Sequence, residues 1–289
     1  NPYLLDAPNA VVLARSQPLC KVPAMVNGNK PTDGGNLLLS EDEKNELLKI
    51  EPAAAEFVRP FSMGDEFINN IPRFCLWLLD CPPNKLREMS LVMKRVEAVK
   101  KMRSTSTKEA TQRDSRKPAL FAEIRQPESG RYLALPRVSS ENRNYIPIGY
   151  LPHTHIAGDK LQTIPGANLY EFGVVTSAMH MAWMRTTSGR LKSDYQYSAK
   201  LTYNTFPWPL NPDSKHQKAI EAAAQQVLDA RAKYPESSLA DLYDPRSMPP
   251  ELVKAHQNLD RAVDAAYGKT TFKTEADRVA FLFELYQQL

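Results

Sequence analysis

The sequence predicts an α+β fold, in which a mixed α/β domain over residues 1–210 precedes an all-α domain over residues 211–289. Three observations predict it. Short β-like runs alternate with apolar residues at helical spacing along the first domain. A proline-rich stretch at 206–212 marks a boundary, because successive prolines favour extended backbone over helix. Beyond it, every apolar pattern has the spacing of a helix.

The first part of the chain contains signals for one strand and two helices. Residues up to about 36 are rich in Pro, Gly and Asn and predict extended chain and turns. Ser40 and Glu43 have the spacing of a capping box, which predicts a helix to about residue 50. The aromatic-rich apolar run 73–79 predicts a buried strand. Apolar residues spaced by three and four over 86–99 predict a long helix with a basic opposite face.

The pattern of the middle of the chain predicts small sheets. The short β-like runs 119–124, 132–135 and 145–151 are separated by Pro and Gly. Residues 168–185 return to helical spacing, and 194–203 alternate well enough for a strand.

The last part of the chain predicts three helices. Capping-box patterns at 214–217 and 274–277 open the first and the last, and the first extends to about residue 234. The second covers 249–267, with Gly268 just beyond its end.

Composition excludes several classes of protein. With 289 residues, 42% of them hydrophobic and 24% charged, the chain can build a core, so disorder is not expected. The longest apolar run, near 74–79, is too short to cross a bilayer, and no secretion leader opens the chain. Three irregularly spaced cysteines favour a reducing, cytoplasmic compartment. Because the chain opens at Asn1, we expect it to be a piece of a longer protein.

The excess positive charge lies in the middle of the sequence. Residues 85–117 carry eleven basic and four acidic residues, and 118–210 carry nine and six. Both flanks are acidic, with seven basic against eleven acidic residues over 1–84 and ten against twelve over 211–289. A basic centre of this kind suits a polyanion such as nucleic acid, although a solvated helix face would look the same.

Motifs for catalysis are missing. None of the eleven glycines lies in the spacing of a dinucleotide or nucleotide phosphate loop. His153 and His155 have no third ligand at a recognised spacing, so we interpret them as a turn rather than a metal site. Cys75 and Cys81 are interpreted as core residues of the predicted strand at 73–79. We therefore expect no catalytic residue, metal or cofactor in this chain.

One polar cluster, at 192–196, could read nucleic-acid bases. If 194–203 is a strand, Lys192, Asp194 and Gln196 project from one face, because side chains alternate along a strand. Lysine donates to guanine, aspartate accepts from cytosine, and glutamine pairs with adenine. An ordinary solvated strand with an internal Lys–Asp ion pair explains the same pattern, and both interpretations stay open at this point.

Blocks of sequence along nearly the whole chain resemble the C-terminal portion of the MmeI-like type IIL/IIG restriction–modification enzymes. The most specific are Met179-His-Met-Ala-Trp-Met-Arg185, Gly189-Arg-Leu-Lys-Ser-Asp-Tyr-Gln-Tyr-Ser198 and Tyr203-Asn-Thr-Phe-Pro-Trp-Pro209. The others are at 6–9, 14–16, 30–35, 73–78, 136–141, 145–149, 240–245 and 255–260.

The resemblance implies a target recognition domain followed by a C-terminal helical domain. In that family the two follow a methyltransferase domain that is adenine-specific and S-adenosylmethionine-dependent. Base reading is implied for Lys192, Asp194 and Gln196, and for a position near Lys160. S-adenosylmethionine, and Mg²⁺ for cleavage, are expected in the missing domains. The implied partners are double-stranded DNA and the methyltransferase domain of the same parent chain.

Six further residues are candidates for contact with the DNA backbone. Four are interpreted as a phosphate-contact group or as a polar turn between strands: Arg137, Ser139, Ser140 and Arg143. Arg185 and Arg190 either orient the reading strand or touch phosphate.

The resulting hypothesis is a sequence-specific duplex DNA recognition module of a larger adenine methyltransferase that also restricts DNA, as in bacterial defence. The alternative is a protein-interaction scaffold, and the third candidate is an enzyme with an unrecognised site.

Overall fold

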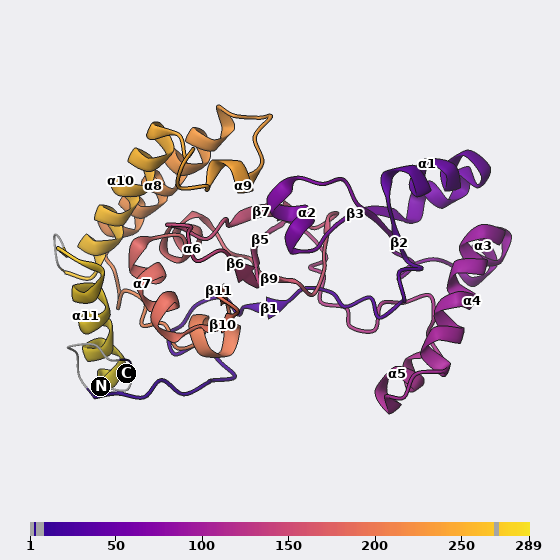
Figure 1. Cartoon of the computed structure of the whole chain (residues 1–289), viewed down its shortest axis with the longest axis horizontal. Coiled ribbons are helices and arrows are strands. Elements are labelled where there is room, and N and C mark those ends of the chain that lie inside the picture. Colours follow the sequence, from indigo (N-terminus) through magenta and orange to yellow (C-terminus); the bar gives the residue numbers. More distant parts are fainter. Residues whose placement is uncertain (1–2, 4–8, 269–271) are drawn as a thin grey trace. The chain divides into compact units, whose positions relative to one another are not determined.

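The described residues fall into two compact units, between which the chain passes several times. The computed structural model describes residues 3, 9–268 and 272–289 (Figure 1). Unit 1 comprises 1–26, 131–150 and 162–289, and unit 2 comprises 27–130 and 151–161. Of the block at 6–9 that resembles the restriction–modification family, residues 6–8 lie outside the described residues.

Unit 2 is built on a four-stranded sheet with the order β2-β4-β3-β8. Strand β3 pairs antiparallel with β4 and parallel with β8. The strands are β2 (Leu38–Leu39), β3 (Val58–Ser62), β4 (Phe74–Leu76) and β8 (Ile156–Ala157). The helices are α1 (Glu41–Ile50), the 3₁₀ helix η1 (Pro52–Phe57), α2 (Gly64–Asn69), α3 (Pro83–Glu88), α4 (Ser90–Ser104) and α5 (Glu109–Asp114).

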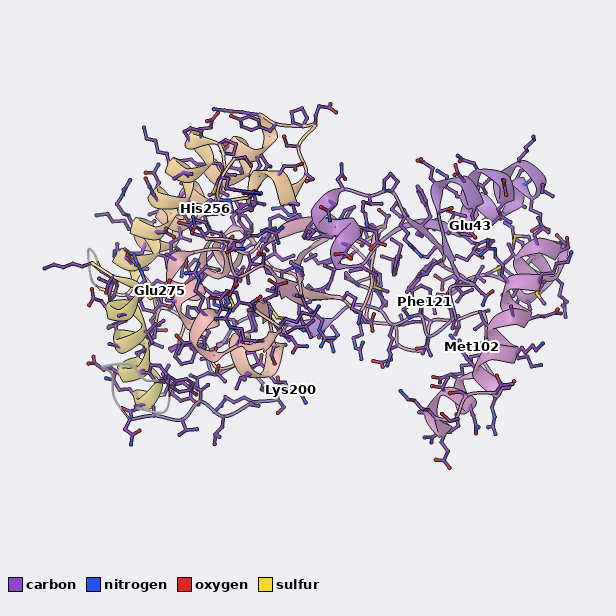
Figure 2. All side chains as sticks on the ribbon, viewed as in Figure 1. Glu43, Met102, Phe121, Lys200, His256 and Glu275 are labelled. Atoms are coloured by element: carbon purple, nitrogen blue, oxygen red, sulfur yellow. The ribbon has the colours of Figure 1, made fainter. Side chains whose placement is uncertain are left out.

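The core of unit 2 joins the sheet to one side of α4. Val92, Val96 and Val99 of α4 are buried in the same cluster as Phe61 and Cys75 of the sheet. Burial raises the pKa of the Cys75 thiol well above its usual range, so this cysteine is a neutral core residue, as the sequence predicted. Figure 2 shows Phe121, which packs edge-on against Phe61.

Arg103 of α4 is fully buried, and its guanidinium joins three stretches of chain. Nε donates to the carbonyl of Thr32 at 2.8 Å, and Nη2 donates to those of Pro31 and Leu120, both at 2.8 Å. Nη1 donates to the carbonyls of Asp114 at 3.1 Å and Lys117 at 2.9 Å. All five N–H donors of the side chain are thus satisfied, which is what a buried cation requires.

Unit 1 contains most of the residues of two further sheets, with the orders β1-β9-β5-β7 and β10-β11-β6. The strands are β1 (Val26–Asn27), β5 (Arg131–Pro136), β6 (Val138–Ser139), β7 (Gly149–Pro152), β9 (Leu161–Pro165), β10 (Gly189–Leu191) and β11 (Asp194–Gln196). The helices are α6 (Leu169–Val175), α7 (Ala178–Thr187), the π-helix η2 (Ala199–Tyr203), α8 (Ser214–Ala232), α9 (Leu239–Leu242), α10 (Pro250–Ala266) and α11 (Glu275–Gln288).

A layer of helices packs within unit 1 around α8. Helix α6 meets α8 closely at Gly173, where an added Cβ would lie 2.6 Å from a methyl of Ile220. Buried Arg231 of α8 donates to the carbonyl of Ile148 at 2.6 Å and to the Tyr243 hydroxyl. That hydroxyl also bonds His256 of α10 at 2.8 Å. These polar contacts connect the C-terminal helices to the segment before β7.

The predicted fold class is confirmed, because sheets and helices mix in the earlier part of the chain and the described residues after 213 form only helices. The predicted capping boxes are present at Ser40 and Thr274. Gly268 has φ +78° next to the end of α10. The buried strand predicted at 73–79 is present as β4. No helix in the described ranges is long and apolar enough to span a membrane.

Several boundaries predicted from the sequence are wrong. Residues 119–124 form no strand beyond one isolated bridge to Lys30, and the helix predicted at 86–103 is divided between α3 and α4. The helix predicted at 168–185 is two helices, because Ser177 caps a new one at Ala178. The first C-terminal helix is capped by Asp213, whose side chain accepts from the His216 amide, and not by Ser214.

A buried carboxyl links the helices of unit 1 to the loop before β7. Asp260 of α10 accepts a hydrogen bond from the Tyr145 hydroxyl at 2.6 Å and from the Ala178 amide at 2.7 Å. Burial raises the pKa of Asp260 to about 6, against the effect of both hydrogen bonds. The folded chain therefore binds this proton more tightly than the unfolded chain does.

Replacing Asp260 with Asn should remove one component of the pH dependence of stability. The contribution of the protonated carboxyl is complete below the ordinary pKa of 3.8 and is lost as the pH rises through about 6. The free energy of unfolding of the wild type, relative to that of Asp260→Asn, should fall by roughly 2 kcal/mol between pH 4 and 7 in urea titrations. A difference that stays constant over this range would contradict the prediction.

Replacing Arg103 with Met should destabilise unit 2 by at least about 3 kcal/mol, because five backbone carbonyls lose the donors of a buried side chain. Arg103→Lys should not restore stability, since one ammonium group cannot reach all five carbonyls. Urea denaturation measures both effects. The control is Arg113→Met at an exposed position, which should change stability by less than about 0.5 kcal/mol. Equal stabilities of Arg103→Met and the control would refute the role of Arg103.

Candidate nucleic-acid interface

Residues 189–196, which include the side chains predicted to read bases, form a hairpin in unit 1. Strands β10 and β11 pair antiparallel, with Arg190 opposite Tyr195, and β11 also pairs with β6, with Tyr195 opposite Ser139. Tyr195 is buried, whereas Gln196 is exposed and Asp194 is half-buried. The alternation predicted for Asp194 and Gln196 is therefore present in the three residues of β11.

Lys192 does not lie on the strand, which corrects the prediction that it shares the strand face of Asp194 and Gln196. It occupies the two-residue loop between β10 and β11, with φ 57°. The strand also ends at Gln196, and residues 199–203 form the π-helix η2, capped by the Ser198 hydroxyl. The loop nevertheless presents Lys192 on the surface, exposed at the tip of the hairpin.

The ion pair of the alternative interpretation is not present: in the described chain Lys192 and Asp194 do not pair with each other. Asp194 accepts only a long hydrogen bond, 3.3 Å, from the Glu141 amide. The Lys192 ammonium and most of the capacity of the Asp194 carboxylate thus remain available to a ligand.

Arg190 of β10 stabilises the hairpin through contacts with β11 and with the loop between the two strands. Its guanidinium stacks 3.8 Å from the centre of the Tyr195 ring and donates to the carbonyl of Ser193 at 2.7 Å. It also lies 3.7 Å from a carboxylate oxygen of Glu141. Of the two roles expected for Arg190, this geometry supplies the orienting one.

Arg185 is also an anchoring residue. It pairs with Glu275 of α11 and donates to the carbonyls of Asn144 at 2.9 Å and Arg143 at 3.3 Å. Its donors thus fix the loop that follows β6 to helices α7 and α11.

The loop after β6 lines a pocket of about 520 Å³ in unit 1. Ser140, Asn142 and Arg143 meet Asp244 and Arg246, which come from the loop between α9 and α10. Burial lowers the pKa of Arg143, while the nearby carboxylates of Asp194 and Asp244 act in the opposite direction. Arg246 forms a 2.7 Å ion pair with Asp244 and is otherwise open to solvent.

Ser139 does not fit the predicted phosphate-contact group. It is 3% exposed, because β6 pairs with β11 at this residue. A phosphate outside the folded chain cannot reach its hydroxyl, so burial in the small sheet excludes it.

Two other predicted positions are Arg137 and Lys160. Arg137 is half-buried, and its carbonyl accepts from the Tyr197 amide at 2.7 Å. Lys160 is exposed in the turn between β8 and β9 and belongs to unit 2, whereas the hairpin belongs to unit 1.

Sequence reasoning missed the contribution of Asp244 and Arg246 to the pocket. They are about a hundred residues from Arg143 along the chain, and no local motif marks them. It also missed His180 of α7, which bonds the Tyr197 hydroxyl at 2.8 Å beneath the hairpin. Burial lowers the pKa of His180 to about 3, so this histidine is neutral and structural.

The two histidines at 153 and 155 lie in a turn of unit 2. The His155 ring bonds the Ser62 hydroxyl at 2.8 Å. Among the residues that the structure describes, no three His, Cys, Asp or Glu side chains are grouped so that they could hold a metal ion.

Comparison with known proteins gives consistent matches over the chain. The family model described as the MmeI target recognition domain matches residues 6–210, and the MmeI C-terminal domain matches 212–289. DNA methyltransferase A of Bacillus subtilis (strain 168) is 37% identical over 290 residues, which cover 100% of this chain and 32% of that protein.

A solved structure gives a similar result. The type IIL restriction–modification enzyme MmeI, determined in complex with DNA, matches with a TM-score of 0.96 and 47% identity. The match covers 99% of this chain and 38% of that one. The chain therefore spans about a third of the length of these two relatives. It belongs to the MmeI family and comprises that family's target recognition and C-terminal domains.

Proposed function

We propose that this chain recognises a specific sequence in duplex DNA through the β10–β11 hairpin, as the recognition part of a larger DNA methyltransferase. The observation that carries the proposal is that Lys192 at the tip of the hairpin and Gln196 on β11 are exposed and Asp194 is half-buried, while Tyr195 between Asp194 and Gln196 is buried. A two-stranded ribbon fits the major groove, where each base pair presents a distinct pattern of donors and acceptors.

Each of the side chains of Lys192, Asp194 and Gln196 has a base edge that it can recognise. The Lys192 ammonium donates to guanine O6 and N7, and the Asp194 carboxylate accepts from the cytosine amine. Together they can read both bases of one G·C pair, and Gln196 can pair with an adenine. Each good contact discriminates by about 1–3 kcal/mol.

The backbone of Lys192 supports a role in binding. A non-glycine residue in the left-handed region costs about 1–2 kcal/mol, and a two-residue hairpin loop prefers Gly or Asn at such a position. Lys192 occupies this position with φ 57°, and no ion pair of the described chain compensates it. Strain of this kind is typical of functional sites, where the side chain is needed for a ligand.

The pocket beside the hairpin suits a backbone phosphate. The half-buried Arg143 and the exposed Arg246 bring two cations to its wall, and Ser140 and Asn142 add hydrogen-bonding groups. Contacts of this type set the register of a protein on DNA without reading its sequence. We assign the pocket this positioning role.

The chemistry of the parent enzyme is assigned to segments beyond this chain. The Bacillus subtilis relative is named a DNA methyltransferase, and the chain covers 32% of it. We infer transfer of a methyl group from S-adenosylmethionine to an adenine extruded from the duplex, with Mg²⁺ for any cleavage. The described residues offer no fitting metal ligands, and the glycines have no cofactor-loop spacing. We propose that both cofactors bind in segments of the parent protein outside this chain.

Replacing Lys192 and Asp194 together with Ala should relax one position of the recognised sequence. Selection of duplexes from a randomised pool by the intact protein should show one base pair losing its preference, because about 1–3 kcal/mol of discrimination is removed. The control is Lys200→Ala, at an exposed residue outside the hairpin (Figure 2), which should leave every position unchanged. An unaltered sequence preference of the double variant would refute the assignment.

Replacing Lys192 with Gly should abolish the base preference without lowering the stability of the protein. Relief of the left-handed strain should leave the free energy of unfolding unchanged or raise it by up to about 1 kcal/mol, while the base preference is lost. The matched control is Leu191→Gly in β10, which should lower stability by about 1 kcal/mol. A destabilisation of Lys192→Gly as large as that of the control, with base preference retained, would contradict a role in reading.

A further inference from the structure

A second basic surface lies in unit 2, on α4 and on the short helix α5 that follows it (Figure 1). Residues 94–117 contain nine basic and three acidic residues. Seven of the nine basic side chains are exposed, and we refer to them as the α4–α5 face: Lys94, Lys100, Lys101, Lys108, Arg113, Arg116 and Lys117.

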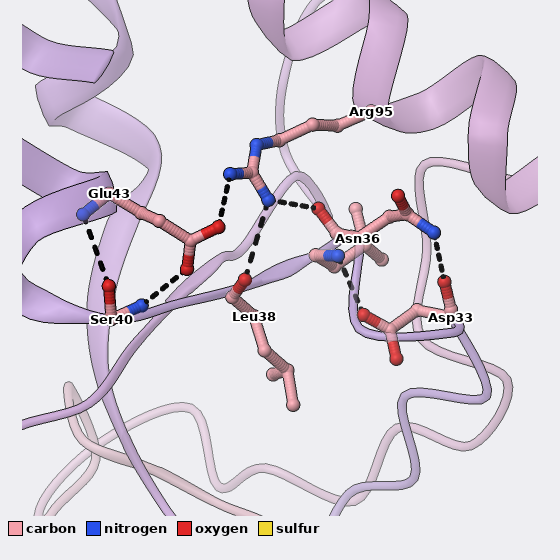
Figure 3. Close-up of polar contacts among 7 residues, drawn as sticks. Asp33, Asn36, Leu38, Ser40, Glu43 and Arg95 are labelled. Atoms are coloured by element: carbon pink, nitrogen blue, oxygen red, sulfur yellow. Dashed lines mark hydrogen bonds and ion pairs between the residues drawn. The ribbon is translucent and has the colours of Figure 1, made fainter. Parts of the chain in front are cut away.

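The other two basic residues, Arg95 and Arg103, are used inside unit 2. Figure 3 shows Arg95 donating to Glu43 at 2.8 Å and to the carbonyl of Asn36 at 3.1 Å. Glu43 in turn completes the capping box of α1 with Ser40. Arg95 therefore attaches α4 to the start of α1.

Arg103 sets the relative position of the two parts of the α4–α5 face. From the last turn of α4 it bonds the carbonyls of Asp114 and Lys117. Asp114 follows Arg113 directly, and Lys117 follows Arg116 directly. The cations after α5 are thus fixed beside the end of α4 by a buried side chain, and not by flexible surface contacts.

The outward side chains of α4 lie on the opposite side from its core. Lys94 and Lys101 are seven residues apart and point away from the buried Val92, Val96 and Val99. None of the seven cations forms an ion pair within the described chain. Like charges that are held together without ion-pair partners repel one another. A bound polyanion would relieve this repulsion, so the face is suited to binding one.

The surroundings of the face favour nucleic acid over an acidic protein. No large hydrophobic side chain between residues 80 and 123 is exposed. A protein interface needs an apolar core, whereas contact with a phosphate backbone does not. Five of the seven cations are lysines, which act as point charges toward phosphate and lack the planar fork that reads bases.

We propose that the α4–α5 face binds the backbone phosphates of duplex DNA without reading sequence, separately from the hairpin. The inference rests on the proposed function, in that the chain must bind duplex DNA. Unit 1 supplies the choice of sequence, and unit 2 supplies salt-dependent phosphate contacts in addition to those assigned to the pocket of unit 1.

The test uses the intact protein with the substitutions Lys94→Gln, Lys101→Gln, Arg113→Gln and Arg116→Gln together. Binding to a selected duplex and to a scrambled duplex is measured between 50 and 300 mM salt. The slope of log affinity against log salt should become shallower by about 0.9 for each phosphate contact removed. Affinity at low salt should fall at least about tenfold for both duplexes, and their affinity ratio should stay within about twofold.

Two control variants make the result specific. Four exposed lysines of α8 and α10 are replaced by Gln to match the change in net charge: Lys215, Lys218, Lys233 and Lys254. This variant should keep the wild-type slope. Arg113→Lys with Arg116→Lys retains the charge and should also keep it. Thermal unfolding of every variant confirms that the chain remains folded.

The outcomes separate this inference from the proposed function. If the wild type prefers its duplex and the quadruple variant keeps the wild-type slope, the α4–α5 face does not bind DNA, and the hairpin assignment is unaffected. Equal losses in the quadruple variant and the charge-matched control would also overturn the inference. If the wild type shows no salt-dependent binding to duplex DNA, the proposed function itself fails.

Discussion

The candidate reading surface depends on the burial of two tyrosines beneath it. Tyr195 and Tyr197 alternate with the outward residues, so their burial fixes which side chains leave the surface. Tyr197 is held by the neutral ring of His180, and Tyr195 is covered by the Arg190 guanidinium. The buried tyrosines therefore stabilise the hairpin, and the exposed side chains of Lys192 and Gln196 are left available to a ligand.

Arginine has two distinct uses in this fold. Arg103 and Arg185 direct several donors to backbone carbonyls, and Arg231 donates to the Ile148 carbonyl and the Tyr243 hydroxyl; all three connect segments distant in sequence. The planar group with five donors suits this task, because it satisfies several carbonyls at once. Lysine, which carries one small ammonium group, dominates the exposed α4–α5 face instead. Counting basic residues by segment locates the positive region but overestimates the charge available to a ligand.

Local signals in the sequence predicted what depends on local structure. The capping boxes at Ser40 and Thr274 and the glycine after α10 were correct, because each involves only neighbouring residues. The alternation at Asp194 and Gln196 was also correct. The strand predicted to continue to 203 was wrong, since the Ser198 cap starts a π-helix there. A β-like run thus gives the side-chain alternation more reliably than the length of the strand.

What the sequence could not supply comes from contacts between distant segments. Ser139 is buried because β6 pairs with β11, some 55 residues later, and no pattern near Ser139 indicates this. The pocket around Arg143 needs the loop at 244–246 in the same way. Lys192 has a left-handed backbone because the loop between β10 and β11 has only two residues. The length of that loop is known only when the ends of both strands are known.

The pairing of Tyr195 with Ser139 also limits how specificity can be transferred between relatives. A graft of residues 189–196 alone would place a foreign strand against the resident Val138–Ser139 edge, with which β11 pairs. The smallest exchangeable cassette is therefore discontinuous and includes β6. Exchange of the outward side chains alone leaves the pairing between β6 and β11 unchanged.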